Sequence, residues 1–194
     1  MIAALYVDSK GSYAGLPDVD LWDEARDARL YQGPHAVVAH PPCSSWCQLA
    51  PINAKRYGHK VGDDGGCFAS ALASVRQWGG VLEHPAHSYA WAAHDLMTPS
   101  RAGWVRDTCG GWTCAVWQGH YGHDAAKGTW LYAFGVTHLP IFTWGKAAGK
   151  ALVSWCNNHG TQHDARPRIG KKAASMTPPA FRDILLSIAR SVPK

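Results

Sequence analysis

A cysteine placed directly after two prolines is the side chain around which a reactive site is predicted. Cys43 ends the segment His40-Pro41-Pro42-Cys43, which follows the short apolar run Ala36–Ala39. Such a run is typical of a buried strand, and each proline fixes its own φ and biases the preceding residue toward an extended shape. Because open α/β sheets bind ligands at the carboxyl ends of their strands, we expect this thiol to face a crevice. A cysteine there can be a nucleophile, a metal ligand or a small apolar residue of the core.

A second apolar run ends in an acidic residue. Val81 and Leu82 lead into Glu83-His84-Pro85, which repeats the order of strand, polar residue and proline. Two such exits on adjacent parallel strands converge on one crevice, so we expect Glu83 to lie near Cys43. A carboxyl group beside a thiol suits acid–base assistance to a nucleophilic addition.

The elements that must position these groups are predicted from local patterns. Strands are expected at 2–7, 19–22 and 36–39, and a helical turn or irregular connection at 23–33. The segment 67–78 is the clearest helix, because Phe68, Ala71, Leu72 and Val75 recur on one face, two aspartates precede it and Gly79-Gly80 ends it. The polar segment 48–66 is predicted to be a loop whose cations, Lys55, Arg56, His59 and Lys60, are either solvated or in contact with phosphate.

The second half of the sequence favours a hairpin and a final helix. Segments 112–118 and 129–134 alternate as strands do, and Thr177-Pro178-Pro179 opens a helix with Phe181 and Leu185 on its apolar face. The expected fold is α/β: a truncated Rossmann-like, mostly parallel sheet with a C-terminal hairpin and helix, in a single domain over residues 1–194. Residues 136–166 show little periodicity and are predicted to form a small irregular subdomain.

Composition limits the class of protein. Hydrophobic residues make up 46% and charged residues 17% of the 194 residues, which is typical of a compact globular domain. The net charge of +5 and eleven histidines favour an anionic partner such as a nucleic acid or nucleotide. No apolar run reaches membrane-spanning length and the first residues do not resemble a signal peptide, so we expect no membrane contact, a cytoplasmic location and reduced cysteines.

Four segments together resemble DNA cytosine-C5 methyltransferases. VVAHPPCSSWC is similar to the family's strand-Pro-Pro-Cys motif, GVLEHP to its strand ending in Glu-Asn-Val, YGHDAAKGTWLYAFG to its Tyr-Gly-Val-Pro-Gln-x-Arg-x-Arg strand, and SMTPPAF to its late Leu-Thr-Pro segment. Their order and approximate spacing agree over residues 36–134 and the tail. The shortened form is most similar to small, divergent methylase-like proteins of bacteriophages, which implies the host cytoplasm.

The resemblance implies a methyltransferase-like fold and roles for individual residues. Cys43 would attack C6 of cytosine, Glu83 would contact the N3 edge of the base, and Lys127 would hold the base carbonyl or a phosphate. S-adenosylmethionine is the implied cofactor, and the residues expected at its site are Asp8, Gly11, Asp20 and Asp27. Nucleic acid, with DNA favoured, is the implied partner, although a nucleotide substrate is also compatible. We expect the substrate to contact His40, Pro42, Trp46, His84, Gln118, Tyr121 and His123.

The sequence departs from the family at several positions. Glu83 is followed by His84 where the family has Asn, and the two arginines of the Gln-x-Arg-x-Arg strand are absent. The base must therefore be oriented differently. The stretch between Asp8 and Cys43 is also short for a complete cofactor-binding half.

Two other classes of function remain open. One is a metal-dependent enzyme, because zinc is commonly bound by His and Cys. The residues with suitable types fall into two sets: His40, Cys43, Cys47, Glu83, His84 and His87, and then Cys109, Cys114, His120 and His123. The other is a non-catalytic methyltransferase descendant that binds nucleic acid or a partner protein.

Overall fold

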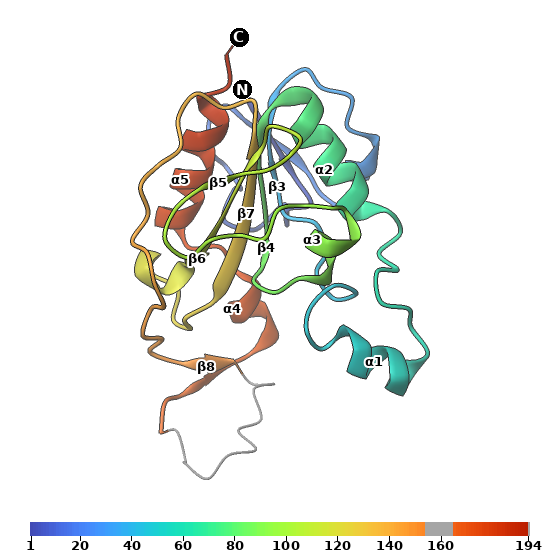
Figure 1. Ribbon diagram of the computed structural model, residues 1–194, viewed down its shortest axis with the longest axis vertical. Helices are drawn as coiled ribbons and strands as arrows, with labels where there is room; N and C mark the ends of the chain where they lie inside the picture. Colours follow the sequence, from blue (N-terminus) through green and yellow to red (C-terminus); the bar gives the residue numbers. More distant parts are fainter. Residues whose placement is uncertain (154–164, 194) are drawn as a thin grey trace.

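The computed structural model describes residues 1–153 and 165–193. Its main feature is a seven-stranded mixed sheet with the order β2-β1-β3-β4-β7-β6-β5 (Figure 1). The expected α/β class, mostly parallel sheet and C-terminal helix are confirmed.

Four parallel strands form the half of the sheet that carries the candidate site. They are β2 (Val19–Trp22), β1 (Ile2–Leu5), β3 (Ala36–Ala39) and β4 (Gly80–Pro85). Ile2 pairs with both Val19 and Ala36, so the carboxyl ends of these strands lie at one edge. β3 and β4 are adjacent and parallel, as expected. Gly80 is required at its position, because a Cβ there would collide with the Val37 carbonyl and its φ is 126°.

Three strands extend the sheet in antiparallel pairing. β7 (Gly128–Phe134) pairs with β4 on one side and with β6 (Trp112–Trp117) on the other, which confirms the predicted hairpin-like pair. The two-residue β5 (Val105–Arg106) pairs with β6 at the edge.

Helices cover the two faces of the sheet. Figure 1 shows α2 (Cys67–Trp78) and α5 (Pro179–Arg190) on opposite sides, and both contact β3 and β4. Alternation along β3 explains the two cores, because Val37 packs in the cluster with the α2 residue Phe68, whereas Val38 packs in the cluster with the α5 residue Phe181. Asp64 satisfies the start of α2 by accepting hydrogen bonds from the backbone N–H groups of Gly66 and Phe68 at 2.9 and 2.8 Å.

One prediction about a connection was wrong. The segment expected to be a loop over 48–66 contains α1 (Ala50–Tyr57). Its signals are present in the sequence: Pro51 in the first turn, Lys55 and Arg56 in the last, and Gly58 in the left-handed conformation at the end.

The remaining elements are short. They are η1 (Ala28–Leu30), α3 (Tyr89–Ala93), η2 (Gln118–Tyr121), β8 (Leu152–Val153), β9 (Arg168–Ile169) and α4 (Lys171–Ser175). β8 and β9 pair in parallel as a separate two-stranded sheet. Part of the predicted irregular subdomain, 154–164, lies outside the described residues. Among the helices of residues 1–153 and 165–193, none has the length and hydrophobicity of a membrane span.

Candidate active site

The ends of β3 and β4 bring a histidine and a glutamate into contact. His40 follows β3, and its backbone N–H donates to the Leu5 carbonyl at 3.0 Å, which extends the sheet by one bond. Its Nδ1 lies 2.9 Å from Oε2 of Glu83, which belongs to β4. The parallel pairing of the strands therefore creates a polar centre where two apolar runs end.

Glu83 is buried but remains ionised. Its side chain is 9% exposed, and Oε1 accepts a hydrogen bond from Nε2 of Gln118 at 3.1 Å. Burial by itself raises the pKa of this carboxyl. The hydrogen bond from His40 and the positive charge of Lys127 outweigh burial and lower the pKa of Glu83 to about 2.

Tyr13 completes a three-residue chain. Its hydroxyl lies 2.8 Å from Nε2 of His40, and its ring is buried in the core. Burial, followed by the negative charge of Glu83, raises the pKa of Tyr13 well above its usual range, so the phenol keeps its proton. The hydroxyl then donates to Nε2, and the hydrogen on Nδ1 of His40 points to Glu83.

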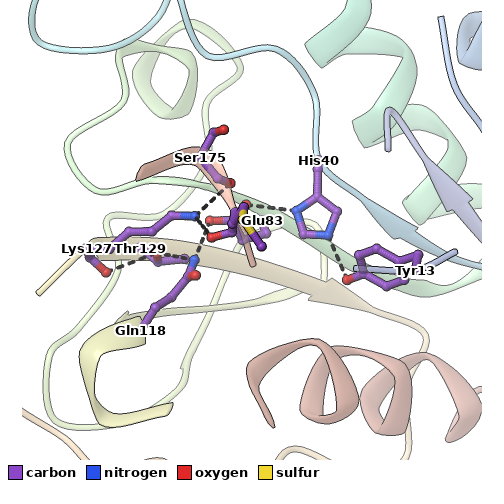
Figure 2. Close-up of polar contacts among 8 residues, drawn as sticks. Tyr13, His40, Glu83, Gln118, Lys127, Thr129 and Ser175 are labelled. Carbon is purple, nitrogen blue, oxygen red and sulfur yellow. Dashed lines mark hydrogen bonds and ion pairs between the residues drawn. The ribbon is translucent and has the colours of Figure 1, made fainter. Parts of the chain in front are cut away.

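Gln118 and Thr129 support Glu83 from the other side (Figure 2). Gln118 Nε2 also donates to Thr129 Oγ1 at 2.9 Å, and that hydroxyl donates to the Lys127 carbonyl at 3.3 Å. Both hydrogens of the amide are thereby used, which orients it. Its Oε1 is buried and has no hydrogen-bond partner within 1–153 and 165–193.

Lys127 joins the C-terminal tail to this centre. Its Nζ donates to the carbonyls of Ser175 and Met176 at 3.1 and 2.8 Å, as Figure 2 shows for Ser175. Burial lowers the pKa of Lys127, and the charges of Glu83 and Cys43 oppose that effect. A cation is thus held between the end of α4 and the two predicted catalytic groups.

Cys43 lies at the start of a turn on the same edge. Its carbonyl accepts hydrogen bonds from the N–H groups of Trp46 and Cys47 at 3.0 and 2.9 Å, and the residue is partly buried. Burial, and then the charge of Glu83, raise the pKa of the thiol to about 11, although Lys127 acts in the opposite direction. Cys43 is therefore a protonated thiol near neutral pH.

A large cavity opens beside the ends of β1 and β2. Its volume is about 1070 Å³, and Asp8, Asp27 and Pro42 are among its lining residues. Gly11 supports Asp8 by donating its N–H to the Asp8 carbonyl at 2.8 Å. Asp20 does not line this cavity, and accepts hydrogen bonds from Trp22 and Arg26 instead.

Sequence reasoning missed further lining residues: Tyr6, Asp23, Glu24 and Arg29. The acidic run directly after β2 was the available signal for two of them. Tyr13 lies in an irregular loop and Thr129 within an apolar strand, so no local pattern marked their roles in the polar centre.

Four predicted substrate contacts lie in other surroundings. Trp46 is 8% exposed and its indole N–H donates to Asp64 at 2.8 Å, so it packs in the core. Nδ1 of His84 lies 2.8 Å from the Ser88 hydroxyl, and burial lowers the pKa of His84 to about 4. The ring of Tyr121 packs against Phe181, and Nδ1 of His123 accepts the N–H of Ala125 at 3.0 Å.

The two His/Cys sets do not assemble into a metal centre in the described part of the chain. No group of three or more His, Cys, Asp or Glu side chains there is arranged to hold an ion. In the second set, Cys109 is exposed in a turn and Cys114 is buried inside β6.

The site thus combines an ionised carboxylate, a neighbouring thiol and a buried cation, an arrangement suited to addition chemistry on an electron-poor ring. No protein-family model and no curated protein sequence matches this chain.

Proposed function

We propose that this protein is a pyrimidine-modifying enzyme acting on nucleic acid, most simply by C5 methyl transfer to cytosine. The observation that carries the proposal is the buried carboxylate of Glu83, which His40 and Gln118 fix at the end of β4 and whose charge acts on the Cys43 thiol. In this reaction Cys43 adds to C6 of the base and Glu83 contacts its N3 edge.

Cys43 supplies the nucleophile. Addition of a thiolate at C6 makes C5 electron-rich, and the carbon can then attack an electrophile. Loss of the C5 proton to a base then breaks the C6–S bond, which restores the ring and releases the Cys43 thiolate. Since the thiol pKa is about 11 in the free protein, thiolate is scarce near neutral pH. Bound substrate must therefore favour the thiolate, and Lys127 is the cation that already lowers the thiol pKa.

Glu83 faces the base as a hydrogen-bond acceptor. An ionised carboxylate accepts a hydrogen bond from the C4 amino group of cytosine, and from N3 once that nitrogen is protonated. Negative charge grows at N3 as the sulfur adds to C6, and the proton that leaves the Cys43 thiol passes through the Glu83 carboxylate to that nitrogen. His40 and Gln118 keep the carboxylate oriented throughout.

The acidic cavity fits the implied cofactor. Its carboxylates, Asp8 and Asp27 among them, suit ribose hydroxyls, an adenine amino group and a sulfonium charge, although both oxygens of Asp27 already accept hydrogen bonds from Arg29 at 2.8 Å. The Tyr6 hydroxyl beside it is buried without a hydrogen-bond partner within the described residues. S-adenosylmethionine, when bound, supplies an electrophilic methyl group. Asp8, Asp27 and Tyr6 are the residues that would hold it.

The loop after Cys43 supports a nucleic-acid partner. Two hydrogen bonds hold the two ends of this loop together. The Ser45 carbonyl accepts the Gly62 N–H at 2.8 Å, and Ser45 Oγ donates to the Asp63 carbonyl at 2.7 Å. Figure 1 shows α1 at the lower right, away from the sheet. Tyr57 is 60% exposed there beside Lys55 and Arg56, a combination suited to base stacking and phosphate contact.

Covalent trapping tests the proposal. The full chain is incubated with S-adenosylmethionine and a sequence-randomised pool of single- and double-stranded DNA containing 5-fluoro-2′-deoxycytidine. We expect an adduct on Cys43, found by peptide mass spectrometry, that is lost in Cys43→Ser and kept in Cys47→Ser. An adduct that persists in Cys43→Ser would show that Cys43 is not the nucleophile, and no adduct with any pool would remove the proposal.

One observation favours a second candidate function. The raised pKa of the Cys43 thiol suits a non-catalytic protein that binds nucleic acid through the same surface. In that case binding is present without adduct, and Cys43→Ser and Glu83→Gln leave the affinity unchanged.

A further inference from the structure

Charge is divided unequally along the chain. From Ala125 to Arg182 there are eight Lys and Arg residues and a single acid, Asp164. Residues 1–124, by contrast, contain nine Lys and Arg and twelve Asp and Glu. The chain's positive charge therefore belongs to its C-terminal part, the pattern expected of a surface that meets a polyanion.

A second cavity lies within this basic part. Its volume is about 470 Å³ and its charged lining residues are Lys127, Lys146 and Arg166, with no acidic residue among the lining. The other lining residues are small or apolar: Ala125, Ala126, Ala147, Ala148, Gly149, Ala151, Leu152 and Val153. Lys146 is exposed, whereas Lys127 and Arg166 also donate to the Ser175 and Gly149 carbonyls. The combined positive charge of the three side chains suits a phosphate group.

Close packing holds the cavity walls together. A Cβ on Gly149 would lie 2.6 Å from the backbone nitrogen of Ala126, so the two backbones are in direct contact. Arg166 donates from Nη1 to the Gly149 carbonyl at 2.9 Å, and the Ala151 N–H donates to the Asp124 carbonyl at 2.9 Å. The cavity is thus preformed in the folded protein and does not depend on a bound ligand.

Lys127 connects this cavity to the candidate active site. It lines the cavity, its charge helps to lower the pKa of Glu83, and it opposes the rise in the pKa of Cys43. A ligand group in the cavity and a base held at Glu83 would therefore both interact with Lys127.

We propose that the cavity lined by Lys127, Lys146 and Arg166 binds a phosphate group of the substrate, adjacent to the pyrimidine under attack. The proposal rests on the proposed function for the position of the base, but the phosphate site itself does not need Cys43. The phosphate comes either from a nucleic-acid backbone or from a mononucleotide, and the two sources share this chemistry.

Lys146 provides the cleanest test, because it is exposed and its neighbour Lys150 is an exposed lysine of the same loop that does not line the cavity. Binding of a fluorescein-labelled oligonucleotide is measured by anisotropy over a range of salt concentrations. In Lys146→Ala we expect about a three- to tenfold weaker affinity and a salt slope smaller by about one. Lys150→Ala should retain most of the affinity. Equal losses in the two variants, or no loss in Lys146→Ala, would overturn the proposal.

The same titration distinguishes a nucleic-acid backbone from a mononucleotide as the source of the phosphate. It also distinguishes a failure of the phosphate site from a failure of the proposed enzyme. Competition by cytidine monophosphate that depends on Lys146 identifies a mononucleotide site, whereas Lys146-dependent oligonucleotide binding without such competition identifies the backbone. Lys146-dependent binding without any Cys43 adduct supports the phosphate site and contradicts the proposed enzyme. A Cys43 adduct together with binding that does not depend on Lys146 supports the enzyme and contradicts the phosphate site.

Discussion

Glu83 lies on β4 and His40 directly follows the adjacent parallel strand β3, and the 2.9 Å contact between Glu83 Oε2 and His40 Nδ1 joins the two strand ends. Tyr13 extends the contact to the loop after β1, and Gln118 extends it to η2. Four segments far apart in the sequence therefore depend on one carboxylate, which makes its charge the natural target of experiment.

Replacing Glu83 with Gln should make Cys43 more acidic. The substitution keeps the shape of the side chain and removes the negative charge that helps to raise the thiol pKa. We expect faster alkylation of Cys43 by iodoacetamide between pH 7 and 9, followed by peptide mass spectrometry. The exposed Cys109 serves as the internal control. An unchanged rate at Cys43 would show that Glu83 does not influence the thiol.

The same substitution should change the acid stability of the protein. The pKa of Glu83 is about 2 in the folded protein and lies near 4.5 in an unfolded chain. A lowered folded pKa stabilises the fold above pH 4.5, by an amount on the order of 3 kcal/mol, and this stability is lost as pH falls toward 2. Urea unfolding of Glu83→Gln should lack this part of the pH dependence. If the free energy of unfolding of Glu83→Gln changes with pH as steeply as that of the unmodified chain between pH 4.5 and 2, the lowered pKa of Glu83 is contradicted.

The buried His84 should cause a separate loss of stability, at higher pH than the loss caused by Glu83. Burial lowers its pKa to about 4, so between pH 6.5 and 4 the unfolded chain binds a proton that the folded protein does not. The free energy of unfolding should therefore decrease as the pH is lowered from 6.5 to 4. In His84→Asn the slope should be shallower by about one proton, whatever the absolute stability, when urea unfolding is measured from pH 7 to 4; His94 and His123, whose pKa values are also lowered, keep the remainder. An unchanged slope would contradict the lowered pKa of His84.

Removing the Tyr13 hydroxyl should cost stability without changing the fold. Tyr13→Phe leaves Nε2 of the half-buried His40 without its donor, which we expect to cost about 1–3 kcal/mol. Urea unfolding measures the loss, and circular dichroism checks the fold. Tyr57→Phe, at a 60% exposed position, is the matched control and should change stability by less than about 0.5 kcal/mol.

Tyr57 itself should matter for nucleic acid. Loss of one stacking side chain typically costs about 1–3 kcal/mol of binding, so Tyr57→Ala should weaken oligonucleotide affinity about five- to 150-fold. Ile141→Ala, at a 93% exposed position outside α1, should bind normally. If the two variants bind equally well, α1 is not part of the interface.

Local signals allowed the bounds of several elements to be predicted. The apolar run Ala36–Ala39 and the periodic segment Cys67–Trp78 have the expected bounds, because alternation, helical periodicity and glycine stops act over a few residues. α1 was missed although its proline, cations and glycine were present, since the many polar and breaker residues around it favoured a loop.

Sequence alone determined that a thiol and a carboxylate follow two buried strands with proline-stiffened exits. The tertiary structure decided what each group can do. Tyr13 meets His40 across 27 residues and Gln118 meets Glu83 across 35, and neither separation follows from local propensity. Such contacts depend on strand order and register, where a shift by one residue moves every side chain to the opposite face. Burial then sets the charge of each group, which is why Glu83 is ionised and Cys43 is not.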